Sequence, residues 1–464
     1  MTAAIALDLG STSIKAGLLR YDATLGDIVS LPAPEIIVSG EYYESDALVY
    51  AARAEQALAQ CLAQTDARPP LGLCSQRSSF LIWEKSGGQP ITPLISWQDT
   101  RGSASCAALR DAEAAIGELS GLRLTPYYFA PKLRVLLLEH PSWRERLERG
   151  EYLVGTLDTF LIWRWTSGRH YVTDASMAAR TLLMDIRQQH WSHGLCDLFG
   201  IPLHILPQIK PSDALAIRLD NGLMLQASMA DQSAAFFACA GTDSKTALVN
   251  LGTGGFVMRD MAHDGQGPEG YLRTLLYSTE TGSTHIAIEG TLNSIAAALA
   301  PFPAEECRVE DMATNDILCL AEPSGLGAPY FRGNIGLRFS QSIEHLLPRQ
   351  IAVLLLEGIV FRVARIVEEF HQTSALERVY LSGGLSGLVC LQQGIAQCVT
   401  MGVYRLQQGE ASLLGAGMFA AGMRCTHNAV EAVAVSNGAR HLPEKYRRWK
   451  IWIDGLLASV ANQK

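Results

Sequence analysis

Short apolar runs joined by a polar turn open the chain. Residues 3–7 and 16–19 are apolar, whereas residues 8–15 between them are mostly polar and include a glycine. This pattern predicts a β-hairpin rather than a strand that leads into a helix.

A second unit of the same kind lies in the middle of the chain. Residues 246–250, with Ala247, Leu248 and Val249 as their apolar centre, precede a glycine turn, and residues 256–258 resume the strand. Two strand-turn-strand units in one chain predict a duplicated α/β domain. We place the boundary close to residues 241–245 and the two domains at 1–242 and 243–464.

Helical periodicity fills much of the remaining chain. Residues 46–64 predict a helix capped by Ser45, and residues 351–370 carry one apolar stripe. Residues 443–460 predict a closing amphipathic helix, and we interpret its aromatic stripe as core packing. Two segments rich in glycine and proline, 264–270 and 323–336, predict long loops.

The composition argues against some classes of binding partner. A net charge of −8 and a pI near 5.8 argue against a general binder of nucleic acid or anionic membranes. Ten cysteines without a Cys-x-x-Cys pair are typical of reduced thiols, and no apolar run approaches the ~18 residues of a membrane span. These features predict a cytoplasmic protein without a signal peptide.

The first turn has the residue types of a phosphate site. Gly10, Ser11, Thr12 and Lys15 can direct backbone N–H groups, hydroxyls and an ammonium at phosphate oxygens, while Asp8 holds a Mg²⁺ ion. An ordinary hairpin remains the alternative for this turn taken alone.

Two later glycine turns repeat this chemistry. Gly252, Thr253 and Gly254 form the turn of the second unit, and Gly383 and Gly384 follow an apolar strand, as expected where backbone approaches a flat ligand. The chain contains neither a Gly-x4-Gly-Lys-Ser/Thr run nor a Gly-x-Gly-x-x-Gly opening a helix. A P-loop enzyme and a dinucleotide-binding dehydrogenase are therefore disfavoured.

Short motifs occur in a fixed order along the chain. They are Asp8-Leu9-Gly10-Ser11-Thr12, Ser96-Trp97-Gln98-Asp99-Thr100-Arg101, Lys132-Leu133, Thr173-Asp174-Ala175-Ser176, Ala230-Asp231-Gln232, Gly252-Thr253, Glu289-Gly290, Ser324-Gly325-Leu326, Glu357-Gly358, Gly383-Gly384 and Glu410-Ala411. In this order they resemble the FGGY carbohydrate kinases, the family of glycerol kinase, xylulokinase and sedoheptulokinase, over essentially the whole chain.

The resemblance implies a fold and a reaction. It implies two ribonuclease-H-like domains of the actin/hexokinase superfamily with a cleft between them, the first binding sugar and the second ATP. Asp231 then matches the catalytic base, and Mg²⁺ and phosphate-binding amides supply the rest of phosphoryl transfer. Capping of a helix that begins at Gln232 is the structural alternative for Asp231.

The resemblance also implies contacts with a small sugar or polyol. The residues carried over are Gln76, Arg77, Trp97, Asp99, Tyr127, Asp231 and Gln232. Glycerol kinases have Gln-Arg-Glu where this chain has Gln76-Arg77-Ser78, and xylulokinases have Met-His at Arg77-Ser78. We therefore favour a ketose such as a pentulose or heptulose, with glycerol as the alternative.

Other interpretations stay open at this point. An actin-like or chaperone-type ATPase shares the fold and the phosphate turns. A sugar-binding pseudokinase is a further alternative, because Ala296 and Gln397 depart from the family pattern in the nucleotide half. His190 and His193 imitate metal-ligand spacing, but we expect surface histidines. A homodimer is considered as an assembly.

Overall fold

The computed structural model describes most of the chain. The predicted loop 264–270 begins with residues 264–266, which lie outside the described residues. The predicted loop 323–336 contains turns and no regular helix or strand. The described residues are 1–261, 267–406, 409–423, 430–435 and 437–461.

The chain forms two compact units. Unit 1 contains Met1–Gly241, Arg273–Ile286 and Glu410–Thr426, and unit 2 contains the remaining segments. The first change of unit falls at Gly241, but two later segments return to unit 1, so the units are not the contiguous halves 1–242 and 243–464. The assignment of those halves as functional domains stays a prediction.

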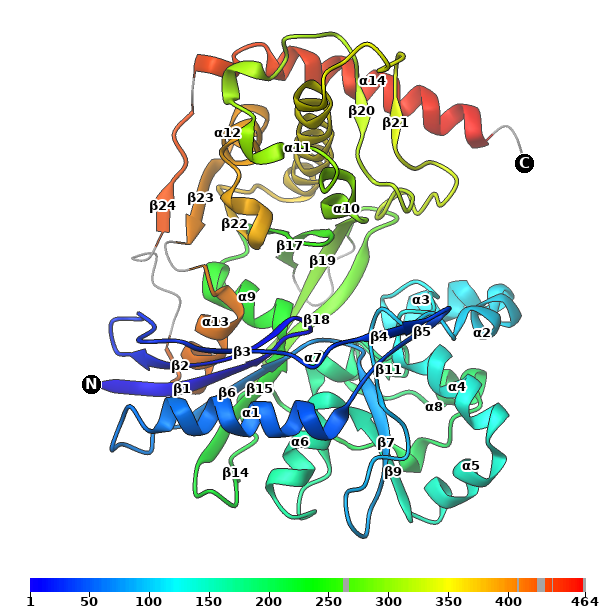
Figure 1. The fold of residues 1–464 in the computed structure, drawn as a ribbon. Coiled ribbons are helices and arrows are strands. Elements are labelled where there is room, and N and C mark those ends of the chain that lie inside the picture. The colour runs from blue at the N-terminus through cyan, green and yellow to red at the C-terminus, as the bar shows by residue number, and fades with distance from the viewer. Residues whose placement is uncertain (262–266, 407–408, 424–429, 436, 462–464) are drawn as a thin grey trace. The chain divides into compact units, whose positions relative to one another are not determined.

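A six-stranded sheet lies at the centre of unit 1 (Figure 1). Its order is β14-β15-β6-β1-β2-β3; β1 pairs antiparallel with β2 and parallel with β6, so the predicted hairpin is confirmed. The strands are β1 (Thr2–Leu9), β2 (Ser13–Arg20), β3 (Val29–Pro32), β6 (Leu71–Ser75), β14 (Ile217–Arg218) and β15 (Met224–Ala230).

The two faces of this sheet differ because side chains alternate along a strand. Ile5, Leu7 and Leu9 of β1 belong to a core shared with helices α1 (Ala47–Leu62) and α6 (Leu157–Trp165). Ala6 lies on the opposite face, where it approaches Gly417 of α13 (Ala411–Ala420). Asp8 is two residues further on, so the alternation directs it to the same face as Ala6.

Helix α13 packs closely against β6 and α9 within unit 1, because a glycine lies at each contact. A Cβ atom at Gly72 of β6 would lie 2.1 Å from the Ala416 carbonyl oxygen. A Cβ atom at Gly415 would lie 1.8 Å from the Ala234 carbonyl oxygen of α9 (Asp231–Ala240). Neither glycine can accept a side chain without displacing backbone.

The predicted helix 46–64 is present as α1, but its cap differs from the prediction. The carboxylate of Asp46 accepts hydrogen bonds from the backbone N–H groups of Leu48 and Val49. Ser45 instead ends strand β5 (Tyr42–Ser45), which pairs with β8 (Leu94–Ile95). The tertiary strand pairing of Ser45 shifts the cap by one residue.

Unit 1 has a further five-stranded sheet with the order β4-β5-β8-β7-β9 and several covering helices. Its remaining strands are β4 (Ile37–Ser39), β7 (Phe80–Glu84) and β9 (Tyr152–Thr156). The other elements are α2 (Ser103–Ala108), α3 (Glu113–Ser120), α4 (Phe129–Glu139), α5 (Pro141–Glu148), α7 (Ala175–Ala178), α8 (His193–Phe199), β10 (Val172–Asp174), β11 (Met184–Asp185), β12 (His190–Trp191) and β13 (Gln208–Lys210).

Unit 2 repeats the strand pairing of unit 1. In its sheet, β16 pairs antiparallel with β17 and parallel with β22, as β1 does with β2 and β6. The order of the whole sheet is β18-β19-β17-β16-β22-β23-β24, and most of its strand β18 and the first residues of β19 fall in the unit 1 segment Arg273–Ile286. The strands are β16 (Thr246–Leu251), β17 (Gly255–Met261), β18 (Leu272–Ser278), β19 (Thr284–Leu292), β22 (Arg378–Ser382), β23 (Gly402–Leu406) and β24 (Val430–Ala432). The predicted duplication is therefore confirmed in the topology.

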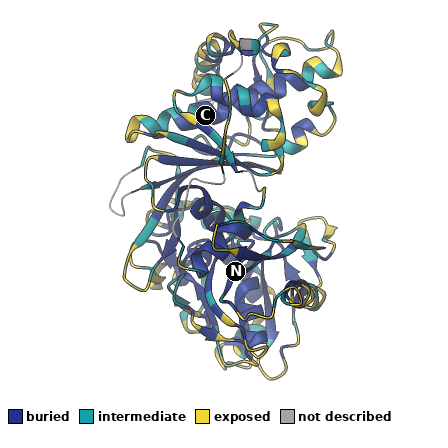
Figure 2. Ribbon diagram, turned by 90° about the vertical axis from the view of Figure 1, so that its left-hand side faces the viewer, coloured by how far each residue is buried: buried dark blue, intermediate teal, exposed yellow. Residues whose placement is uncertain are grey.

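Helices enclose the core of unit 2, and the central strands are mostly buried (Figure 2). The predicted helices 351–370 and 443–460 are present as α11 (Pro348–Thr373) and α14 (Leu442–Ala461). Trp449 of α14 is buried and donates a hydrogen bond to the Cys319 carbonyl oxygen, as expected for core packing. The remaining elements are α10 (Ile295–Leu299), α12 (Val389–Cys398), β20 (Cys319–Leu320) and β21 (Arg338–Phe339). Within the described ranges, no helix combines the length and the apolar character that crossing a bilayer requires.

Candidate functional site

Asp8 lies near the end of β1, opposite Lys15 of β2. Its Oδ1 atom is buried and has no hydrogen-bond partner among the described residues. Burial raises the pKa of Asp8 to about 7, and the Asp231 carboxylate adds to this rise, whereas the Cys74 thiol and Lys15 oppose it. Lys15 forms an ion pair of 2.6 Å with Glu410, which precedes α13. The Asp231 and Glu410 carboxylates and the Lys15 ammonium therefore all act electrostatically on Asp8.

Asp231 is the first residue of α9, so the helix begins one residue earlier than predicted. Its Oδ1 accepts a hydrogen bond of 2.7 Å from the backbone N–H of Gln232, and the Nε of Arg77 lies 3.8 Å away. A carboxylate in the first turn of a helix is favoured by the helix dipole. These contacts fix one oxygen of Asp231 while both Asp231 and Gln232 remain partly exposed.

A buried polar network supports the segment before Asp231. The Ser176 hydroxyl accepts a hydrogen bond of 2.8 Å from the backbone N–H of Ala230 and donates one of 2.8 Å to Asp174. Asp174 also accepts a hydrogen bond from the Ser212 hydroxyl, and burial raises its pKa to about 7. Asp174 is therefore linked to the residue before Asp231 through one hydroxyl.

The predicted sugar segments meet at Ser79, which is fully buried. Its hydroxyl donates to Oε1 of Gln76 and accepts from the backbone N–H of Trp97, both at 2.9 Å. Gln76 also donates to the Gly10 carbonyl oxygen over 3.4 Å. The neighbouring Ser78 donates its hydroxyl to the Arg180 carbonyl oxygen, so it is directed into the protein.

Two other predicted sugar contacts lie in different surroundings. Asp99 is fully buried, and its two oxygens accept from Arg101 and from the backbone N–H of Tyr43. A ligand bond to Asp99 would therefore require these bonds to break. Tyr127 is 48% exposed, on the loop before α4. The roles of both residues stay predictions.

The glycine turns of unit 2 present backbone rather than side chains. The N–H of Gly252 donates to the Gly254 carbonyl oxygen over 2.8 Å, and the Thr253 carbonyl oxygen accepts from Ala296. Gly383 follows β22 with φ of +85°, and a Cβ atom there would lie 2.4 Å from the Leu251 carbonyl oxygen. The backbone of Gly383 therefore lies close to the backbone at the end of β16. Gly384, in contrast, has open space around it.

The structure brings together some of the predicted site residues in unit 1 through direct contacts: Gly10 with Gln76, and Arg77 with Asp231. Ser11 and Thr12 lie in the same turn as Gly10. Sequence reasoning assigned no role to Ser79, Lys132, Asp174, Ser176 or Glu410. All but Ser79 belong to the quoted motifs, so a signal was present for four of the five.

The structure shows no group of three or more His, Cys, Asp or Glu side chains placed to hold a metal, as far as the described residues extend. His190 and His193 are exposed, as expected of surface histidines.

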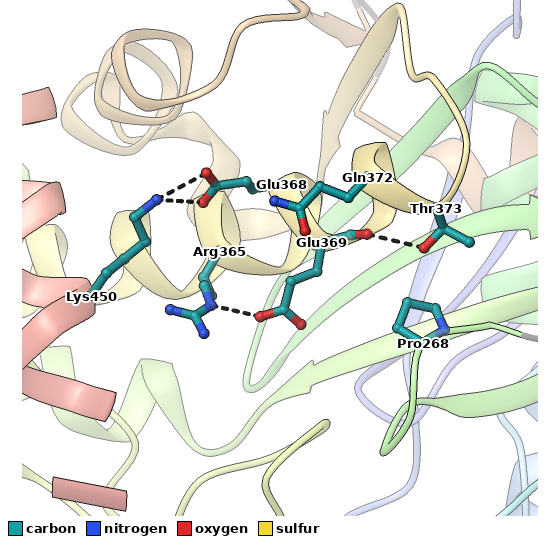
Figure 3. Close-up of a pocket in the computed structure, with 7 residues that line it drawn as sticks. All are labelled: Pro268, Arg365, Glu368, Glu369, Gln372, Thr373 and Lys450. Carbon is teal, nitrogen blue, oxygen red and sulfur yellow. Dashed lines mark hydrogen bonds and ion pairs between the residues drawn. The ribbon is translucent and has the colours of Figure 1, made fainter. Parts of the chain in front are cut away.

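A surface pocket of about 500 Å³ lies elsewhere in unit 2, on α11 (Figure 3). Its charges cancel in pairs: Lys450 lies 2.9 Å from Glu368, and Arg365 lies 2.6 Å from Glu369 (Figure 3). The residues that line it include none of the predicted site residues, so we do not assign the phosphate chemistry to it.

Comparison with known proteins assigns the family. Residues 3–249 match the N-terminal domain, and residues 247–423 the C-terminal domain, of the FGGY family of carbohydrate kinases. A glycerol kinase of Shewanella piezotolerans is 30% identical over 446 residues, covering 90% of this chain and 89% of that protein.

Solved structures share the fold. A Plasmodium falciparum glycerol kinase with ADP has a TM-score of 0.85 at 21% identity, covering 97% of each chain. A xylulose kinase of Rhodospirillum rubrum has a TM-score of 0.81 at 19% identity, covering 97% of this chain and 98% of the other. The expected two-domain fold of the actin/hexokinase type is confirmed. The chain belongs to the FGGY family of carbohydrate kinases, enzymes that transfer a phosphoryl group from ATP to a hydroxyl group.

Proposed function

We propose that this kinase phosphorylates a five- to seven-carbon ketose or polyol, with Asp231 as the catalytic base. The observation that carries the proposal is the state of Ser78, which is buried and hydrogen-bonded to the Arg180 carbonyl oxygen. A glutamate at this position in glycerol kinases is a strong acceptor for small-polyol hydroxyls. This chain has no such carboxylate at residue 78, so a three-carbon substrate loses a principal contact.

Asp231 has the surroundings of a general base. One oxygen accepts from the Gln232 N–H and faces Arg77, and the carboxylate is partly exposed, so it can take the proton of an attacking hydroxyl. Phosphoryl transfer needs little covalent help from the protein, so an oriented carboxylate contributes mainly by positioning the hydroxyl and removing its proton. Gln76, Arg77, Trp97 and Gln232 are the proposed donors and acceptors for the other hydroxyls.

The three glycine turns are the proposed phosphate and nucleotide contacts. Gly10, Ser11, Thr12 and Lys15 offer N–H groups, hydroxyls and an ammonium in unit 1. Gly252, Thr253, Gly254, Gly383 and Gly384 offer backbone in unit 2. The Plasmodium falciparum glycerol kinase structure contains ADP, which supports a nucleotide site in this fold.

Asp8 fits a magnesium ion by its chemistry. Its buried oxygen lacks a hydrogen-bond partner among the described residues, and Mg²⁺ commonly binds one or two carboxylates together with water and substrate phosphates. When bound, Mg²⁺ neutralises charge on the phosphates. Ion pairing of Lys15 with Glu410 keeps the ammonium beside Asp8.

A substrate panel tests the proposal. The purified enzyme is given Mg-ATP with glycerol, D-xylulose, other pentuloses, hexuloses, heptuloses and pentitols, and kcat/KM is measured by product formation. We expect a ketose or longer polyol to give a higher kcat/KM than glycerol. A site that hydrogen-bonds a substrate hydroxyl discriminates by up to ~10⁴–10⁵ against analogues that lack it. Preference for glycerol over the whole panel contradicts the proposal, and ATP hydrolysis without any sugar product favours the ATPase alternative.

We also propose a cytoplasmic location and allow for a homodimer. The location is supported by the described cysteines, which form no disulfides. Light scattering after size-exclusion chromatography measures the assembly directly, and a monomer at micromolar concentration contradicts the homodimer.

A further inference from the structure

Lys132 of α4 is a charged residue that the mechanism above does not use, and it is fully buried. Its Nζ donates a hydrogen bond of 2.8 Å to the Ser96 carbonyl oxygen and one of 3.3 Å to the Ser78 carbonyl oxygen. These two carbonyls belong to different loops of unit 1, one after β6 and the other after β8. One ammonium therefore joins two segments of chain.

Both segments carry proposed sugar contacts. Ser78 follows Arg77, and Ser96 precedes Trp97. The Ser79 hydroxyl joins the same segments a second time, through Gln76 and the Trp97 N–H. Lys132 and Ser79 thus each form a buried link between the two segments.

The backbone at Ser78 has an unusual conformation that such a link can hold. Its φ is +64°, in the left-handed region that residues other than glycine seldom adopt. Residues in such conformations persist where surrounding contacts over-determine them, and they occur often at functional sites. Here the contacts are the Lys132 ammonium on the carbonyl oxygen and the Arg180 carbonyl oxygen on the hydroxyl.

No carboxylate in the described part of the chain forms a direct ion pair with Lys132. Its Nζ lies 5.7 Å from the centre of the Phe80 ring, and the charged groups that act on it are Asp99 and Arg101. Burial lowers the pKa of Lys132 to about 7, Asp99 opposes this change and Arg101 adds to it. A buried ammonium without its own carboxylate is costly, which argues for a specific task.

We propose that Lys132 is a positioning residue of the sugar site, which holds segments 76–79 and 96–97 in the geometry that binds the substrate hydroxyls. The inference rests on the proposed function of these segments. A positioning residue acts through the backbone, so its loss alters sugar binding and leaves the nucleotide turns of unit 2 unchanged. Misplacement by about 1 Å costs on the order of 10²-fold in such sites.

The test is Lys132→Met in the full-length enzyme, with kcat and both KM values measured on the panel substrate that the wild type uses best. We expect the KM for that sugar to rise about 10- to 100-fold, with the KM for ATP within about twofold of wild type. Lys132→Gln, whose amide still donates, should recover part of the loss. Product formation by the wild type tests the proposed function separately.

Lys445→Met is the matched control. Lys445 is equally buried, but it lies in unit 2 and pairs with Glu357 at 2.5 Å. This variant should lose thermal stability and keep the wild-type KM for the sugar. An unchanged sugar KM in folded Lys132→Met overturns the proposal. Failure of both Lys132 variants to fold also overturns it, since the lysine then serves the core of the unit.

Discussion

The two hairpins that open the repeated sheets carry different chemistry at the same position. Asp8 is the penultimate residue of β1, and Asn250 is the penultimate residue of β16. The parallel neighbour of Asp8 is Cys74 in β6, and that of Asn250 is Ser382 in β22, directly before Gly383. One copy of the fold thus presents a carboxylate where the other presents an amide.

This difference extends to how each unit supports its site. Unit 1 uses charged side chains, which need buried partners: Asp174 and Ser176 behind Asp231, and Lys132 behind the sugar segments. Unit 2 uses glycine turns, and at Gly383 the constraint is a positive φ together with the lack of space for a Cβ atom. Unit 1 should therefore be sensitive to the loss of functional groups, and unit 2 to the addition of atoms.

The largest effect is expected at the carboxylate of unit 1. Asp231→Asn keeps an acceptor for the Gln232 N–H but cannot take a proton, so kcat should fall by ~10²–10⁴. The fold and the affinity for ATP should remain, as measured by circular dichroism and nucleotide titration. Asp220→Asn, at an exposed carboxylate, is the control. Near-normal turnover of a pure Asn variant excludes Asp231 as the base.

Adding one methyl group to unit 2 should have the next largest effect. In Gly383→Ala the new Cβ meets the Leu251 carbonyl oxygen at a φ of +85°, which should lower the free energy of unfolding by ~1–3 kcal/mol. We expect a weaker affinity for ATP with unchanged sugar binding, measured by calorimetry. Gly387→Ala meets no atom within 4 Å and should behave as wild type. Equal behaviour of the two variants refutes the backbone constraint.

Removing the hydroxyl behind Asp231 should have a smaller effect. Ser176→Ala leaves the Ala230 N–H without its acceptor and lets the start of α9 shift, so kcat should fall about 10-fold. The matched control is Ser212→Ala, which removes another hydroxyl from Asp174 without touching Ala230. If Ser212→Ala reduces kcat as much, the link through Ser176 has no special role.

The smallest effect concerns stability against pH. Burial raises the pKa of Asp174 to about 7, above the ~3.9 of an unfolded aspartate, so the folded state holds the proton more tightly. Its stabilising contribution is complete below pH ~4 and is lost as the pH rises through about 7. Asp174→Asn should flatten this decline by at most ~1.4 kcal/mol per pH unit, measured by urea unfolding at pH 5 and 7. An unchanged slope contradicts the assignment.

Much of the fold could be predicted because burial sets a period along the chain. The hairpins at 8–15 and near Gly252 follow from apolar runs, and α11 and α14 from stripes that are buried in the structure. The sequence did not predict the cap at Asp46, because Ser45 is the last residue of β5. Its strand partner, Leu94, is distant in the sequence. The resemblance supplied Asp231, but the bonds of Asp99 and the contacts of Lys132 depend on tertiary structure and leave no local pattern.

The segment that closes unit 1 is made late. Helix α13 packs on β1, β6 and α9 with glycine-sized tolerances, yet more than 160 residues separate Ala411 from Gly241 in the chain. During synthesis, the face of the unit 1 sheet that packs on α13 therefore stays without this helix until most of unit 2 has left the ribosome. A fragment that ends at Gly241 lacks the helix that covers Ala6 and Gly72, so the packing of unit 1 can be completed only after most of unit 2 has been synthesised.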